Sequence, residues 1–225
     1  AITIEQLEPA SWLVVATGVV ALAAVTLDDV WRWSRNVVTV VHEGGHALAA
    51  VVTGRRLTGI RLHSDTSGLT LSVGRPSGPG MVVTTAAGYL GPSLVGLAGV
   101  ALLAAGQVTV MLWGAAALLL AMLVMIRNAY GALTLVVCGA VVVGLSLYAS
   151  PDVQAGFGYA MTWFLLFGAV RPVGELWRQR RGQEGRYSDA AQLARLTHVP
   201  TGMWVGFFGL ATGAALAAGG RLLLT

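Results

Sequence analysis

The chain has 225 residues, of which 56% are hydrophobic and only 11% are charged, and its formal net charge is +4 at neutral pH. A soluble globular domain carries about 25% charged residues, so this composition predicts an integral membrane protein. The basic residues, all arginines, cluster beside apolar runs, which the positive-inside rule explains without a nucleic-acid partner. The single cysteine, Cys138, excludes disulfides within the chain and multi-cysteine zinc sites.

Apolar runs of the length needed to cross a bilayer, about twenty residues, recur along the chain. They predict an all-α polytopic membrane protein with six or seven transmembrane helices in one domain over residues 1–225. The spans are expected at approximately 11–27, 36–54, 81–105, 108–126, 129–149, 153–170 and 201–220. The first run follows a segment without basic residues, unlike a signal peptide, so we expect it to be retained as a helix.

Arginine placement predicts the orientation in the membrane. A cytoplasmic N-terminus puts eleven arginines on the cytoplasmic side and leaves three, Arg32, Arg35 and Arg221, on the far side. The positive-inside rule favours this arrangement. We therefore expect a cytoplasmic N-terminus. The expected location is a bacterial plasma membrane.

A small β-hairpin is predicted after the second span. Apolar residues alternate with other residues on both sides of a turn-forming stretch at 64–68, and they are Ile60, Leu62, Leu69, Leu71 and Val73. An unpaired strand edge cannot face lipid, so this hairpin is expected at the membrane interface or inside a protein-lined cavity. An ordinary cytoplasmic hairpin is the alternative.

The second span contains the sequence His42-Glu43-Gly44-Gly45-His46. On a helix, positions i and i+4 share a face, so both imidazoles can bind one metal ion, and Glu43 beside them can act as base on a metal-bound water. This is the arrangement of zinc metallopeptidases. Each ionisable group at membrane depth costs roughly 2.5–3.5 kcal/mol of insertion free energy. Three such groups together therefore favour a functional site over the alternative, in which they are polar residues lining a helix interface.

Two histidines do not complete a catalytic zinc site, which normally has three protein ligands and one open position. The remaining histidines, His63 and His198, do not follow the motif at the short spacing of soluble three-histidine proteases. The sequence therefore points to a carboxylate that folding brings close.

Together with its surroundings, this motif resembles the site-2 proteases, which are intramembrane zinc metalloproteases, and most closely their short, minimal branch. The further matches occur in the same order along residues 36–204, and they are Gly54-Arg55, the Asp-Thr-Ser-Gly turn at 65–68, the Ala-Gly-Tyr-Leu-Gly-Pro stretch at 87–92 and the segment from Ser188 to Trp204.

The resemblance implies that His42 and His46 bind Zn²⁺ and that Glu43 activates the water. It also implies hydrolysis of peptide bonds in or near the transmembrane segment of single-span membrane proteins. The hairpin at 60–73 would hold such a segment extended by strand addition.

The third ligand is less directly implied, because larger site-2 proteases use an aspartate in an Asn-Pro…Asp-Gly type motif that this chain lacks. Asp189, in the Ser-Asp-Ala segment that the minimal branch shares, is the predicted third ligand. Its simplest alternative role is to cap the following helix. Asp65 and Glu175 are the other candidates, although Asp65 suits a turn and Glu175 suits pairing with an arginine.

A rival interpretation is a catalytically silent metalloprotease homologue that acts as a subunit or chaperone of a membrane complex. The intact Glu43 favours the enzyme, because a purely structural metal site has no use for a general base. Small residues at Gly202, Gly206, Gly209 and Gly213 have the spacing of a helix-packing face. Packing within one chain explains this spacing equally well, and a homodimer is a further alternative for the partner. The lipid bilayer is the expected environment in every case.

Overall fold

The computed structural model describes residues 11–179, 182 and 184–225. The helices are α1 (Ser11–Thr26), α2 (Asp28–Val52), α3 (Pro79–Ala104), α4 (Val108–Met125), α5 (Ala129–Tyr148), α6 (Pro151–Gln179), α7 (Asp189–Thr197) and α8 (Thr201–Leu224), with a 3-10 turn η1 (Glu184–Tyr187). The strands are β1 (Arg56–Leu62) and β2 (Gly68–Val73). The predicted fold class, a helical membrane protein with a small β-hairpin after the motif helix, is confirmed.

Five of the described helices, α3 to α6 and α8, are each long and apolar enough to cross a bilayer. Helices α1 and α2 meet at an angle of 102° and add a sixth span if they are counted as one bent crossing. With 16 residues, α1 is about 24 Å long, which is short of the roughly 30 Å hydrocarbon core. The number of candidate spans among the described residues therefore reaches six, the lower of the two predicted numbers, only if α1 and α2 together count as one span.

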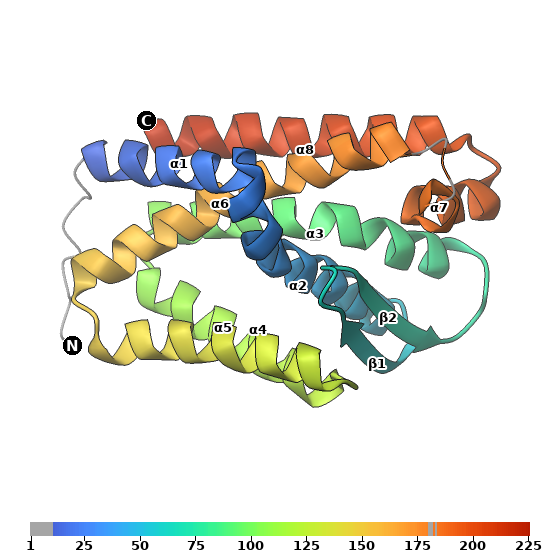
Figure 1. Ribbon diagram of the computed structural model, residues 1–225, viewed down its shortest axis with the longest axis horizontal. Coiled ribbons are helices and arrows are strands. Elements are labelled where there is room, and N and C mark those ends of the chain that lie inside the picture. Colours follow the sequence, from blue (N-terminus) through green and yellow to red (C-terminus); the bar gives the residue numbers. More distant parts are fainter. Residues whose placement is uncertain (1–10, 180–181, 183) are drawn as a thin grey trace.

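The helices form a bundle in which α3 and α6 are central. Figure 1 shows α1 and α8 along one side of the bundle and α4 and α5 along the opposite side, with α7 and the β-hairpin at the same end. Only 11% of the most apolar stretch of α4 and 17% of that of α5 is buried within the protein. These two helices therefore present most of their apolar surface to lipid.

The β-hairpin packs against α2 through its first strand. Ile60 and Leu62 are 0% and 2% exposed and belong to a core cluster with Val40 and Ala47 of α2. Strands β1 and β2 pair antiparallel, with Ile60 opposite Thr70 and Leu62 opposite Gly68. The hairpin therefore packs on the helix that carries the His-Glu-Gly-Gly-His sequence.

The outer edge of β1 is occupied by the α4–α5 connection. The backbone N–H of Arg127 donates to the carbonyl of Ile60 at 2.8 Å. The Asn128 side chain donates to the carbonyl of Leu62 at 2.6 Å and accepts from its N–H at 3.2 Å. The hairpin therefore has one edge left for pairing, the outer edge of β2.

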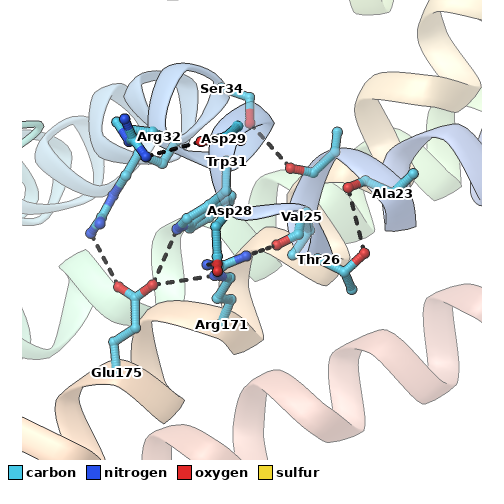
Figure 2. A network of polar contacts seen from close by, with 12 residues as sticks. Ala23, Val25, Thr26, Asp28, Asp29, Trp31, Arg32, Ser34, Arg171 and Glu175 are labelled. Carbon is cyan, nitrogen blue, oxygen red and sulfur yellow. Dashed lines mark hydrogen bonds and ion pairs between the residues drawn. The ribbon is translucent and has the colours of Figure 1, made fainter.

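A second polar group of residues holds the bend between α1 and α2 against α6, and Figure 2 shows it from close by. We call it the ion-pair cluster, and its members are Asp28, Trp31, Arg35, Arg171 and Glu175. Glu175 accepts from Trp31 Nε1 at 3.1 Å and pairs with Arg35 and Arg171 at 3.2 and 3.3 Å. The Arg35 and Arg171 guanidinium carbons lie 5.6 and 5.0 Å from the centre of the Trp31 ring. These charges compensate one another where α2 and α6 extend as helices beyond the predicted apolar spans.

Candidate metal centre

Three predicted ligands converge where α2 meets the start of α7. His42 and His46 lie one turn apart on α2, and their Nε2 atoms are 3.1 Å from each other. Each Nε2 is 3.2 Å from Oδ2 of Asp189, the first residue of α7. We call these three residues the ligand cluster. Within the described ranges, they are the one group of histidines and carboxylates close enough to share a metal ion.

Asp189 is available to this cluster because its neighbour caps the helix. The Ser188 hydroxyl is the N-cap of α7 and accepts a hydrogen bond from the Ala191 N–H at 3.3 Å. Burial by itself would raise the pKa of the Asp189 carboxyl, but the positive charge and hydrogen bonds that the adjacent imidazoles offer when protonated outweigh that effect and hold its pKa well below the usual range. The carboxylate is thus an anion aimed at the two histidines.

The ring of His46 is fixed by the backbone of α3. Its Nδ1 lies 2.7 Å from the carbonyl oxygen of Thr84, which can only accept, so Nδ1 carries the proton. When the ring is neutral, its lone pair is then on Nε2, the atom that faces His42 and Asp189. A hydrogen bond from the second nitrogen to a carbonyl is the usual support of a metal-bound histidine.

Two glycines allow α2 and α3 to approach closely at this level. A Cβ on Gly45 would lie 2.5 Å from the Ala87 carbonyl oxygen, so a side chain there would push the helices apart. A Cβ on Gly88 would lie 2.3 Å from Nε2 of His46 and 2.6 Å from Nε2 of His42. The space in front of both ligand nitrogens therefore depends on the missing side chain of Gly88.

Glu43 is directed toward the β-hairpin. Its side chain is buried, and Oε2 accepts a hydrogen bond from the Thr70 hydroxyl at 2.6 Å. A Cβ on Gly68 would lie 2.5 Å from Oε1, so β2 passes directly over the carboxylate. Within the described residues, no hydrogen bond is made to Oε1. Oε2 is thus held by Thr70, and Oε1 is left to accept a hydrogen bond or a proton.

The ligand cluster and Glu43 both line one cavity of about 540 Å³. Its walls come from α2, β2, α3, α6 and the segment from Tyr187 to Gln192. The ligand cluster, Glu43 and the β2 residues Gly68 to Thr70 all line it. A cavity of this size accommodates a short peptide segment rather than a water molecule alone.

The other predicted candidates are engaged elsewhere. Asp65 holds its own turn, accepting from the N–H and hydroxyl of Ser67 at 2.9 and 2.7 Å. Glu175 belongs to the ion-pair cluster. His63 bonds to Ser67 in the same turn, and His198 is the left-handed C-cap residue of α7. The structural roles expected for Asp65 and Glu175 are the ones that the structure gives them.

The donor set fits zinc. Nitrogen and oxygen ligands bind Zn²⁺ at about 2.0–2.2 Å, so neighbours in a tetrahedral site are separated by about 3.3–3.5 Å. The observed separations of 3.1, 3.2 and 3.2 Å are close to these values. Two imidazoles and one carboxylate also form a ligand set typical of catalytic zinc with one open position. These three residues would hold the ion.

Sequence reasoning did not identify four residues that shape this site, namely Thr70, Thr84, Gly88 and Tyr89. Gly88 and Tyr89 lie in the Ala-Gly-Tyr-Leu-Gly-Pro stretch, which was a usable signal. Thr84 acts through its carbonyl and Thr70 through a contact between a strand and a helix. Neither contact leaves a local pattern in the sequence.

Comparison with known proteins gives a family for the chain. A family model described as Peptidase M50B-like matches residues 15–219, which include the ligand cluster and Glu43. No curated protein and no solved structure matches the chain. The M50 peptidases are zinc metalloproteases. Because the match covers most of the 225 residues, the chain belongs to the Peptidase M50B-like family, part of the site-2 protease family.

Proposed function

We propose that this protein is an intramembrane zinc metalloprotease of the site-2 type, which hydrolyses peptide bonds in or near the transmembrane segments of single-span membrane proteins. The observation that carries the proposal is the convergence of His42, His46 and Asp189 on the cavity that Glu43 also lines. A purely structural metal site would have no need of a buried, ionisable carboxylate beside it. Zinc bound by the cluster would lower the pKa of a coordinated water towards about 7 and polarise the peptide carbonyl.

Glu43 is the general base in this proposal. Oε1 accepts a proton from the attacking water as the water oxygen adds to the carbonyl carbon, and it later delivers that proton to the amine nitrogen as the C–N bond breaks. The Thr70 hydroxyl holds Oε2 at 2.6 Å and so fixes the direction in which Oε1 points. His46 keeps its proton on Nδ1 through the Thr84 carbonyl.

The free edge of β2 is the proposed binding place of the substrate backbone. The backbone groups of Ile60 and Leu62 bond to the α4–α5 connection, on the side of β1 that faces away from β2. In an antiparallel pair, the residues opposite them, Thr70 and Gly68, also direct their N–H and carbonyl groups away from the hairpin. In the described part of the chain, no other backbone bonds to that edge. An extended peptide added there would lie beside Glu43, because Gly68 and Thr70 both contact this residue.

Replacement of Glu43 by Gln tests this assignment. The amide cannot accept the water proton, so we expect cleavage of co-expressed single-span membrane proteins to fall by roughly 10²–10⁴-fold. Zinc content should stay at the wild-type level, because Glu43 is outside the ligand cluster. The measurement is the cleaved fraction by immunoblot, with zinc per chain determined on the same purified protein.

Two results would count against the proposal. Undiminished cleavage in the Glu43→Gln variant would remove Glu43 from the role of base. A wild-type protein that holds zinc but cleaves no member of a broad panel would favour the silent subunit of a membrane complex.

A further inference from the structure

Tyr89 lies on the wall of the candidate active site, directly after Gly88 on α3. Its ring meets the ring of His42 edge-on, with centroids 5.0 Å apart and an interplanar angle of 83°. On its other side it stacks on Phe208 of α8, with centroids 5.0 Å apart and an angle of 20°. These two contacts fix the ring beside the ligand cluster.

The hydroxyl of Tyr89 is the polar end of this fixed ring. Among the residues that the structure describes, it has no hydrogen-bond partner. The charged groups that act on it are the carboxylates of Asp189 and Glu175 and the guanidinium of Arg35. A tyrosine hydroxyl in a protein interior usually finds a partner, so this one is held ready for a group that enters the cavity.

Most other donors on the cavity wall already have partners. The hydroxyls of Thr39, Thr84 and Thr85 each bond to a backbone carbonyl, and Thr70 bonds to Glu43. Arg35 is paired with Glu175. Thr66, Tyr187 and Gln192 also line the cavity, and their side chains make no hydrogen bond within the described part of the chain; we take Gln192 of α7 as the rival donor. Tyr89 differs from Gln192 because its ring is in contact with a predicted metal ligand.

We propose that the Tyr89 hydroxyl donates a hydrogen bond to the oxyanion that forms on the substrate carbonyl during hydrolysis. This inference rests on the proposed protease function. When the water oxygen bonds to the carbonyl carbon, the π pair of the C=O bond moves to the carbonyl oxygen. The water proton goes to Glu43 and then to the leaving amine. Tyr89 keeps its own proton throughout and stabilises the negative oxygen, which returns its electron pair as the C–N bond breaks.

The Tyr89→Phe variant isolates the hydroxyl, because the ring contacts with His42 and Phe208 are retained. Loss of one oxyanion donor lowers kcat by roughly 10²–10³-fold in comparable sites, and we expect that fall with an unchanged KM and unchanged zinc content. A phosphinic peptide, whose tetrahedral oxygens resemble the oxyanion, should bind the variant at least roughly 10-fold more weakly. Isothermal titration with this probe gives a readout that does not depend on turnover.

Tyr130→Phe is the matched control. It removes a hydroxyl that bonds to Asn36 at 3.1 Å outside the cavity, so kcat and inhibitor binding should not change. An unchanged kcat in Tyr89→Phe, or a raised KM alone, would overturn the inference. So would a fall in kcat that appears in Gln192→Ala and not in Tyr89→Phe. If the wild type itself cleaves no substrate, the protease proposal on which the inference rests is overturned instead.

Discussion

Helix α2 carries two partly buried polar clusters that handle charge in opposite ways. In the ion-pair cluster, two arginines face Glu175 and Asp28, so positive and negative groups compensate each other. In the ligand cluster, two imidazole nitrogens and one carboxylate oxygen, which can all offer lone pairs when the imidazoles are neutral at Nε2, point at one another within 3.1–3.2 Å. Only the second arrangement calls for an added cation.

This difference suggests a structural role for the ion-pair cluster and a chemical role for the ligand cluster. Polar groups that pair inside the protein can enter the membrane region because each desolvated charge finds its partner. Acceptors that converge without a donor are costly until a proton or a metal ion is bound among them. We therefore expect that damage to the ligand cluster affects zinc and catalysis, and that damage to the ion-pair cluster affects stability.

The largest effect should follow from Gly88→Ala. The new Cβ would lie 2.3 Å from His46 Nε2, so the ligand atoms must move apart. Zinc affinity should fall by roughly 100-fold or more, and cleavage should be lost with it. The matched control is Gly139→Ala on α5, where a Cβ would meet nothing within 4 Å. Competition with a metal chelator compares the two variants, and equal zinc affinity would show that the space in front of the histidines is not needed.

A smaller and different effect is expected from Glu175→Ala. Arg35, Arg171 and Trp31 lose their shared acceptor, which should cost roughly 1–3 kcal/mol of stability after allowance for their partial exposure. The thermal unfolding midpoint in detergent should fall by several degrees while zinc per chain is unchanged. Loss of zinc with an unaltered midpoint would reverse the assignment of the two clusters.

Much of this candidate site could be predicted from the sequence, because its first two candidate ligands are local. The i, i+4 spacing of His42 and His46 puts both rings on one helical face whatever the rest of the chain does. Asp189 lies 143 residues after His46, and only the resemblance of its segment to the minimal site-2 proteases pointed to it. The alternative role as a helix cap belongs to Ser188, whose hydroxyl caps α7, and this leaves the Asp189 carboxylate free to act as a ligand.

The parts that could not be predicted depend on tertiary contacts. The charged stretch from Asp28 to Arg35 looked like a break between spans, yet it is the first part of α2. Asp28 and Asp29 suit the positive end of the helix dipole, and Arg35 pairs with Glu175 far along the chain. Likewise, the free hydroxyl of Tyr89 becomes visible only when α2, α3 and α8 are packed together.

The most direct test of the central claim is the zinc content per chain of the purified wild type, Asp189→Ala and Asp65→Ala. Asp65 is the control because it is an acidic candidate that holds only its own turn. We predict about one zinc per chain in the wild type and in Asp65→Ala, and a large reduction in Asp189→Ala. Zinc retained in Asp189→Ala, or absent from the wild type after zinc is added back, would contradict the account.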